Sequence, residues 1–210
     1  MTVTLIITII TSVISFMAFS NQKLTNDLIF YPPAIATRNQ WYRFFSCGLV
    51  HADFTHLLFN MFSFYMFGQY VEQAYQQIFP QTGTLLYLVL YVSALAVCLI
   101  PTYMQHREDP YYRSLGASGA VSAVIFAGIF LFPTQGIGIL FIPIAIPGFI
   151  FGPLYLIISG LLNKKGGGNI NHSAHIWGAI YGLVFTMVTS SVLSKYDLFE
   201  NFMQQVRNYF

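Results

Sequence analysis

The sequence predicts an all-α membrane protein built as a bundle of six transmembrane helices. The chain of 210 residues is 56% hydrophobic and only 8% charged, whereas soluble domains carry about 25% charged residues. So few charges could not cover a water-soluble surface, and the mean hydropathy is +0.62. The apolar residues also gather in six segments, close to the length of about 20 residues that a membrane-spanning helix needs. This length suits a single domain over residues 1–210.

The stretches between the apolar segments differ in character. Residues 21–53 hold too many aromatic side chains for a free linker, so this first loop is predicted to lie partly in the membrane interface. Prolines and glycines in residues 133–148 predict a hairpin-like or irregular connection, and the glycines in residues 164–169 predict a flexible loop. Apolar residues three or four apart in the tail, residues 195–210, are typical of an interfacial helix. The approximate spans are residues 3–19, 54–70, 84–103, 115–132, 149–162 and 174–193.

Charge and cysteine content argue against several classes of site. A net charge of +2 is too small to indicate a nucleic-acid partner. Cys47 and Cys98 lie far apart in apolar surroundings, without the spacing of a disulfide framework or a metal site. His172 and His175 are spaced like metal ligands, but no third ligand is evident, and the H-E-x-x-H motif is absent. We therefore expect no metal and no other cofactor; the lipid bilayer is the expected partner, and the oligomeric state stays open.

Ser118 stands at the start of the fourth predicted span, in the motif Gly116-Ala117-Ser118-Gly119. The first turn of a helix has unpaired N–H groups and a partial positive charge, so a hydroxyl there lies beside a ready oxyanion site. Gly116 and Gly119 would leave room for a substrate carbonyl. One buried serine is more often a packing residue, so the hypothesis that Ser118 is a nucleophile depends on residues of other spans.

His175 begins the sixth predicted span, and histidine is the usual base for a serine nucleophile. Gly178 and Gly182 follow it on the same helix, and the fourth span has its own side of small residues. Two helices pressed together by such faces would bring Ser118 and His175 to a similar depth. No acidic residue lies within a span near either of them in sequence, so we expect a Ser–His dyad and not a triad.

His56 and Asn60 lie four residues apart in the second predicted span, so they share a helix face. Each side chain can donate a hydrogen bond. Considered alone, such a pair more often has a structural role, in which its hydrogen bonds hold the second span against its neighbours. Beside Ser118 and His175, we interpret them as donors that stabilise an oxyanion together with the Ser118 backbone N–H.

Together these motifs resemble those of the rhomboid intramembrane serine proteases, over about residues 41–188. Each motif is weak alone, but their order and spacing on six apolar segments make the combination specific. The motifs are His51-x4-His56-Leu57-Leu58-Phe59-Asn60, Gly68-x3-Glu72, Gly116-Ala117-Ser118-Gly119 and Ala174-His175-x2-Gly178-x3-Gly182.

The resemblance implies a role for each candidate residue. Ser118 would be the nucleophile and His175 the general base, while His56 and Asn60 would form the oxyanion hole with the Ser118 amide. The site would open to the extracytoplasmic side through a water-filled cavity. Residues 163–173, the loop before the last span, would cap it.

Three further positions follow from the resemblance. Arg43 corresponds to an arginine that braces the first loop, and His51 to a histidine with a structural role. The main departure is Ser122, because many relatives have at this position a tyrosine that stacks on the catalytic histidine. Trp177, two residues after His175, is one candidate to support the ring instead.

The predicted function is hydrolysis of transmembrane or juxtamembrane segments of other membrane proteins, by a multi-pass protein of the cell (inner or plasma) membrane. One alternative is a catalytically inactive relative that only binds membrane proteins, although every catalytic position is filled here. A small transporter is a second alternative, but only His56 is an ionisable residue clearly within a span. The family topology places seven Lys and Arg residues on the outer side and two on the inner side. Because basic residues usually lie on the inner side, this count favours the opposite orientation. We nevertheless follow the orientation of the family.

Overall fold

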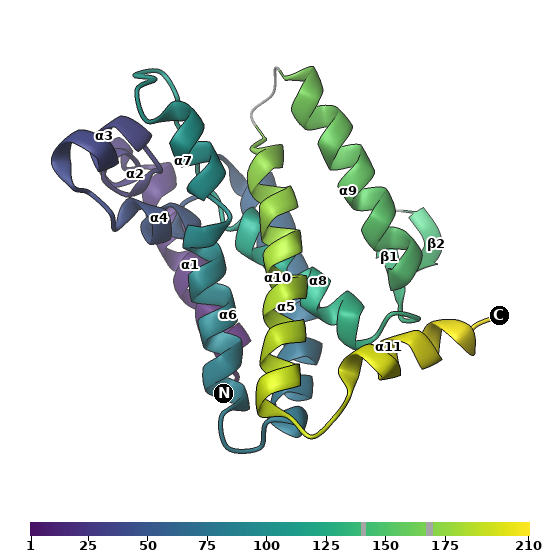
Figure 1. Ribbon diagram of the computed structural model, residues 1–210. Coiled ribbons are helices and arrows are strands. Elements are labelled where there is room, and N and C mark those ends of the chain that lie inside the picture. The colour runs from purple at the N-terminus through teal and green to yellow at the C-terminus, as the bar shows by residue number, and fades with distance from the viewer. Residues whose placement is uncertain (140–141, 167–169) are drawn as a thin grey trace.

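Helices make up most of the structure, which confirms a predominantly helical fold (Figure 1). The structure is a computed structural model and describes residues 1–139, 142–166 and 170–210. A helix occupies most of each apolar segment of the sequence. These helices are α1 (Val3–Phe19), α5 (Phe54–Ile78), α6 (Gly83–Val97), α8 (Ser118–Leu131), α9 (Gly148–Lys165) and α10 (His172–Leu193).

Helix α8 lies inside the bundle, in contact with α5, α6 and α10. Every residue of α8 after Ser118 except Ile125 is buried. The backbone of α10 packs directly on that of α8: a Cβ added at Gly178 would overlap the carbonyl of Gly119, and one added at Gly182 would overlap the carbonyl of Ala123. The small residues of these two segments therefore form a close helix–helix contact.

Helix α5 continues to Ile78, beyond the predicted end near residue 70. Glu72, an acidic residue just beyond the predicted end, is buried inside the bundle. The buried carboxylate of Glu72 accepts hydrogen bonds from the backbone N–H groups of Val3 at 2.8 Å and Thr4 at 2.9 Å, and from the Thr4 hydroxyl at 2.7 Å. These N–H groups belong to the first turn of α1, so Glu72 satisfies orphan donors and opposes the positive end of that helix.

The third predicted span, residues 84–103, is divided in two. Helix α6 ends at Val97, a turn follows, and α7 (Ile100–His106) continues in nearly the same direction (Figure 1). Pro101 explains the division, because it has no N–H for the carbonyl of Val97 and its ring clashes with that carbonyl in a continuous helix.

The first loop folds into short helices that lie beside the upper end of the bundle in Figure 1. Arg43, which is buried, donates hydrogen bonds to the carbonyls of Asn26 at 2.9 Å and Ile29 at 2.7 Å, and to the side chain of Gln40 at 2.6 Å. Arg43 thus joins three turns of the loop. The elements are α2 (Gln22–Leu28), α3 (Pro32–Arg38), α4 (Arg43–Ser46) and the 3-10 helix η1 (Cys47–Leu49).

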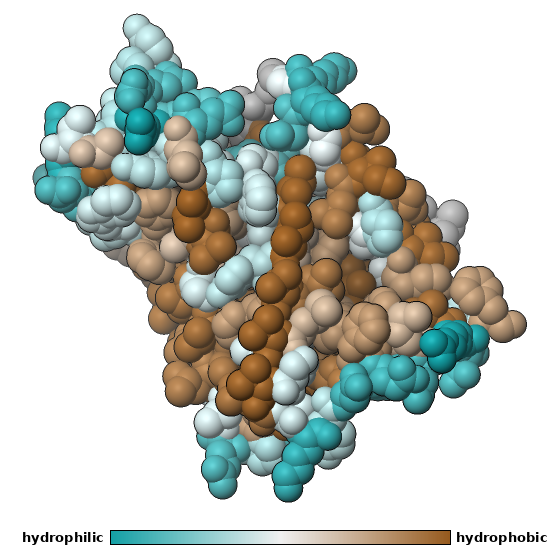
Figure 2. Space-filling view, in the orientation of Figure 1, coloured by the Kyte–Doolittle hydropathy of each residue, from teal (hydrophilic) through white to brown (hydrophobic). Residues whose placement is uncertain are grey.

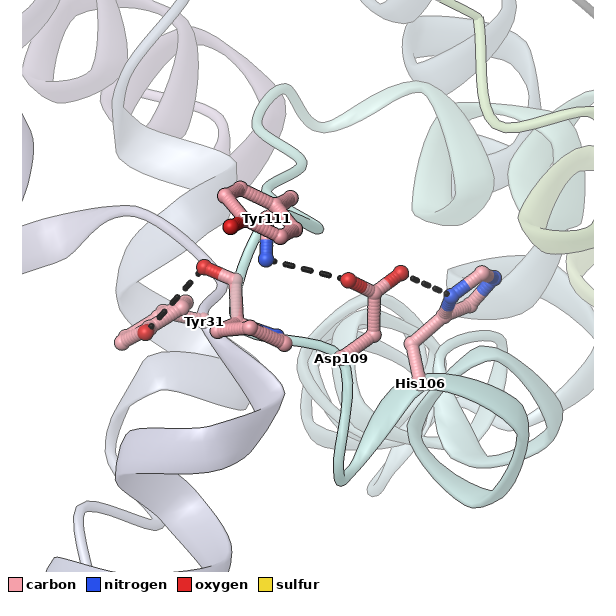
Figure 3. A network of polar contacts seen from close by, with 5 residues as sticks. Tyr31, His106, Asp109 and Tyr111 are labelled. Atoms are coloured by element: carbon pink, nitrogen blue, oxygen red, sulfur yellow. Dashed lines mark hydrogen bonds and ion pairs between the residues drawn. The ribbon is translucent and has the colours of Figure 1, made fainter.

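The connection from α7 to α8 is tied to this first loop (Figure 3). The Tyr31 hydroxyl donates to the carbonyl of Pro110 at 3.3 Å, and the Asp109 carboxylate accepts from the Tyr111 backbone N–H at 3.0 Å. Asp109 also lies 3.2 Å from Nδ1 of His106. The guanidinium of Arg113 stands over the Tyr31 ring, 4.7 Å from its centroid. These contacts fix the chain that leads into Ser118.

Residues 133–148 contain a hairpin, as predicted, so the fold is not purely α-helical. Strands β1 (Gly136–Ile139) and β2 (Ile142–Pro147) pair antiparallel. After the hairpin, α9 continues to Lys165, beyond the predicted end at residue 162, and Gly166 with a φ of 63° follows it. Residues 167–169 of the predicted flexible loop lie outside the described residues.

The tail forms the amphipathic helix α11 (Leu198–Arg207), which returns to the bundle. Leu198 is buried in the main core, and the ring of Phe202 stacks on that of Phe130 at a centroid distance of 5.7 Å. Polar side chains cover the outer edge of α11 in Figure 2. This helix runs beneath α8 in Figure 1 and contacts it.

The surface matches a protein that lies in a bilayer. Figure 2 shows a hydrophobic belt across the middle of the face in view, between two hydrophilic ends. Among the described residues, two helices are long and apolar enough to cross a membrane, namely Gly83–His106 (α6 continued by α7) and α10. Helices α1 and α8 are shorter and apolar.

Candidate active site

Ser118 and His175 meet where the two central helices begin. Ser118 is the first residue of α8, and His175 lies in the first turn of α10. Nε2 of His175 is 2.7 Å from the Ser118 hydroxyl oxygen, and both side chains are half-buried. A serine hydroxyl that can donate its proton to a neighbouring imidazole is an activated nucleophile.

Gly119 allows the two helix ends to approach so closely. A Cβ at this position would lie 2.5 Å from the sulfur of Cys98 and 3.1 Å from the carbonyl oxygen of Ala174. Gly119 therefore has a packing role in the structure. Its predicted place beside a substrate carbonyl stays a prediction.

The start of α10 is anchored to α7 as well as to α8. The Asn171 side chain accepts a hydrogen bond from the backbone N–H of Ala174 at 3.0 Å, which caps the helix. Its amide nitrogen donates to the Thr102 hydroxyl at 3.1 Å. This bond fixes the turn that carries His175.

His56 places its ring against the motif of the nucleophile. Gly116 has a φ of 107°, which favours glycine, and a Cβ there would lie 2.9 Å from Nε2 of His56. The backbone N–H of Ala52 donates to Nδ1 of His56 at 3.4 Å. Nδ1 is therefore the acceptor and Nε2 carries the proton in the neutral ring. The protonated nitrogen is thus the one beside Gly116.

Asn60 lies one turn after His56 on α5 and is 7% exposed. Its amide nitrogen donates to the backbone carbonyl of His56 at 3.0 Å. An amide nitrogen has two N–H donors, so this bond leaves the second for a ligand. The two predicted oxyanion donors therefore lie one turn apart on α5, and the ring of His56 lies beside Gly116; the role of Asn60 in the oxyanion site stays a prediction.

No carboxylate within the described part of the chain is hydrogen-bonded to His175. The other histidine of this turn, His172, has its ring centroid 5.9 Å from that of His175. Among the described residues, no group of three or more His, Cys, Asp and Glu side chains is arranged to hold a metal ion. Ser118 and His175 contact each other directly, and their action as a catalytic dyad stays a prediction.

His51 holds the loop before α5 in place through its neutral ring. The Ser15 hydroxyl donates its one proton to the carbonyl of Leu49 at 2.9 Å, so it accepts from Nδ1 of His51, also at 2.9 Å. Nε2 of His51 accepts from the backbone N–H of Ala117 at 3.5 Å. Burial lowers the pKa of His51 to about 3. His51 thus connects α1 to the residue before the nucleophile.

Acidification should weaken the fold through His51. The folded-state pKa of about 3 lies below the ordinary 6.5, so the unfolded chain binds more protons in this window and the stability falls as the pH falls through it. From about pH 7.5 to about pH 5, His51 should account for a loss of about 2 kcal/mol. His51→Gln should unfold with a smaller pH dependence of its melting temperature in detergent. An unchanged pH dependence would contradict this role.

Tyr155 of α9 is a neighbour of the dyad that the sequence did not single out. Its hydroxyl lies 2.8 Å from that of Ser122, and its ring is inclined by only 21° to the ring of His175, with centroids 6.5 Å apart. Trp177 is 47% exposed. The rings beside His175 are those of His172, which stands edge-on to it, and Tyr155, which lies nearly parallel to it. Spacing within one helix cannot reveal a contact made from another helix, so no sequence signal pointed to Tyr155.

A small cavity adjoins the nucleophile. Its volume is about 10 Å³, and its walls include Leu95, Cys98 and Ser118. This volume suits about one water molecule. The cavity is therefore too small for a bulky side chain unless its walls move.

Comparisons with known proteins agree with these motifs. The rhomboid protease GlpG of Haemophilus influenzae is 28% identical over 192 residues, which cover 89% of this chain and 92% of GlpG. The rhomboid protein YdcA of Bacillus subtilis is 29% identical over 151 residues, 71% of this chain and 67% of YdcA. RHOMBOID-like protein 12, mitochondrial, of Arabidopsis thaliana is 30% identical over 138 residues, 61% of this chain and 40% of the plant protein.

The region of similarity contains every candidate residue of the site. Residues 38–192 match the rhomboid domain, which includes α5, α6, α8, α9 and α10. Because this match covers well over half of the chain, the protein belongs to the rhomboid family, whose members are integral membrane proteins.

Proposed function

We propose that this protein is an intramembrane serine endopeptidase that cleaves transmembrane or juxtamembrane segments of other membrane proteins. The observation that carries the proposal is the 2.7 Å contact between His175 Nε2 and the Ser118 hydroxyl, at the half-buried start of a central helix. A polar pair in such apolar surroundings is costly unless it has a chemical task. The similarity to the rhomboid protease GlpG supports the same reaction.

In the first step, His175 takes the Ser118 proton while the serine oxygen attacks the substrate carbonyl. The negative charge moves to the carbonyl oxygen, where the Ser118 backbone N–H, His56 Nε2–H and the Asn60 amide can receive it. The start of α8 adds favourable dipoles at this point. The tetrahedral intermediate collapses, the C–N bond breaks, and His175 returns the proton to the leaving amine.

In the second step, water hydrolyses the acyl-enzyme. His175 takes a proton from the water, the hydroxide attacks the ester carbonyl, and the C–O bond to Ser118 breaks as the proton returns to the serine oxygen. The small cavity beside Ser118 offers a place for such a water. Its size also favours a small substrate side chain next to the cleaved bond.

We further propose that α1, α5, α6 with α7, α8, α9 and α10 each cross the cell membrane. The hydrophobic belt of Figure 2 supports this arrangement. The site would open toward the side of Asp109 and Lys165, outside the cell. Arg43 donates to backbone carbonyls and Arg113 stands over an aromatic ring, so these two charges carry less weight in the positive-inside count.

An impermeant thiol reagent applied to intact cells should label Lys165→Cys. Protection of this cysteine from the reagent would reverse the proposed orientation.

The decisive experiment exposes the purified protein to a panel of single-span membrane proteins and, separately, to a fluorophosphonate probe. Cleavage and covalent labelling are both expected, and His175→Ala should lose both. Labelling without cleavage of any substrate would narrow the proposal to a serine hydrolase of another specificity. Binding of a membrane protein with neither labelling nor cleavage would identify an inactive relative.

Asn60→Ala should lower kcat by about 10²- to 10³-fold, because the oxyanion loses one donor. The measurement is cleavage of a single-span substrate in proteoliposomes. Gln73→Ala, an exposed position further along α5, is the matched control and should keep full activity. An Asn60→Ala protein that is as active as Gln73→Ala would show that Asn60 only joins helices.

A further inference from the structure

Tyr155 lies against both of the helices that carry the dyad. It belongs to α9, yet its ring contacts α8 through Phe126, with centroids 5.5 Å apart, and lies alongside the ring of His175 on α10. Phe151, one turn earlier on α9, stacks on it at 5.9 Å. The ring is therefore fixed by packing before it meets His175.

The hydroxyl of Tyr155 connects α9 to the backbone of the nucleophile. Ser122 donates its only hydroxyl proton to the backbone carbonyl of Ser118, at 2.9 Å. Its oxygen must then accept from the Tyr155 hydroxyl, which lies 2.8 Å away. The chain of bonds runs from Tyr155 to Ser122 and on to the Ser118 carbonyl. Tyr155 thus contacts one dyad residue through its ring and reaches the other through its hydroxyl.

We propose that Tyr155 is a positioning residue that α9 contributes to the dyad, holding the His175 ring and the first turn of α8 in register. This inference rests on the proposed proteolytic function. Ser122 cannot hold His175 itself, because its side chain is short and its proton is used by the Ser118 carbonyl. The hydroxyl oxygen of Ser122 instead accepts a hydrogen bond from Tyr155, an aromatic residue of the neighbouring helix.

The test separates the ring of Tyr155 from its hydroxyl. Tyr155→Leu should lower kcat by about 10- to 100-fold with KM within about twofold, because a shift of the imidazole by a fraction of an ångström impairs the chemical step. Tyr155→Phe keeps the ring, so its kcat should fall only about three- to tenfold, which corresponds to the loss of one hydrogen bond. Ser122→Ala should match Tyr155→Phe, and the double variant should be no slower than either single variant.

Tyr181→Leu is the matched control, since Tyr181 also joins a serine of another helix, Ser93, at 2.6 Å. Its kcat should stay near that of the wild type. If Tyr155→Leu fails to fold, Tyr155→Phe and Ser122→Ala still decide the hydroxyl's part. A wild-type kcat in both Tyr155→Phe and Ser122→Ala would overturn the role of the hydroxyl. It would also be overturned if the double variant lost as much kcat as the product of the two single losses. A wild-type protein that neither cleaves nor reacts with a fluorophosphonate would instead overturn the proposed function.

Discussion

Replacing Ser118 with alanine should reduce cleavage of a single-span substrate by about 10⁴- to 10⁶-fold. The hydroxyl oxygen is the only candidate nucleophile at hydrogen-bond distance from His175 in the described part of the chain, at 2.7 Å. His175→Ala should cost about as much, and the double variant should be no slower than either single one, because the two residues act as one unit. Rates are measured in proteoliposomes, beside covalent labelling by a fluorophosphonate.

The fold should survive this change, which makes the result easy to interpret. Ser118→Ala removes one half-buried hydrogen bond, worth about 1 kcal/mol, and leaves the packing of α8 on α10 intact. Ser190→Ala is a suitable control, because Ser190 is also buried and bonded, to the carbonyl of Met187 on α10, but lies far along the helix from His175. Cleavage by Ser118→Ala at more than a few per cent of the Ser190→Ala rate would contradict the assignment.

The sequence was informative about features that depend on residues close together in the chain. Apolar segments of membrane length indicated where the long helices lie. The Gly116-Ala117-Ser118-Gly119 motif and His175 indicated which helix ends should meet. The predicted proximity of Ser118 and His175 is confirmed. It could be predicted because each residue lies in the first turn of a helix and small residues follow it. Two helices with small faces have few ways to pack, and those ways bring their ends to a similar depth.

The sequence was less informative about polar side chains whose hydrogen-bond partners lie on another helix. The second span was predicted to end near residue 70, yet α5 continues past Glu72, because the Glu72 carboxylate accepts hydrogen bonds from the backbone N–H groups at the start of α1. Tyr155 could not be found for the same reason, since its partners Ser122 and His175 belong to α8 and α10. Periodicity relates residues within one helix, whereas these contacts depend on how helices are placed around one another.

The second large effect is expected at Gly178, where α10 crosses α8. Gly178→Ala should lower the melting temperature and reduce kcat by at least about 10²-fold. The new methyl group would overlap the carbonyl of Gly119, a backbone group that cannot rotate away, so the two helices must separate. Overpacking of this kind costs about 1–3 kcal/mol. The separation occurs beside the dyad, and a displacement of about 1 Å there can cost 10²-fold in rate.

Two other glycines distinguish this mechanism from general destabilisation. At Gly182, a Cβ would overlap the carbonyl of Ala123, further from the dyad, so Gly182→Ala should lose similar stability but less activity. Gly160 on α9 has nothing within 4 Å of an added Cβ, so Gly160→Ala should be neutral or more stable by up to about 1 kcal/mol. If Gly178→Ala melted and cleaved like Gly160→Ala, the backbones of α8 and α10 could not be in contact. The dyad would then need another explanation for its geometry, because that contact is what sets the distance between Ser118 and His175.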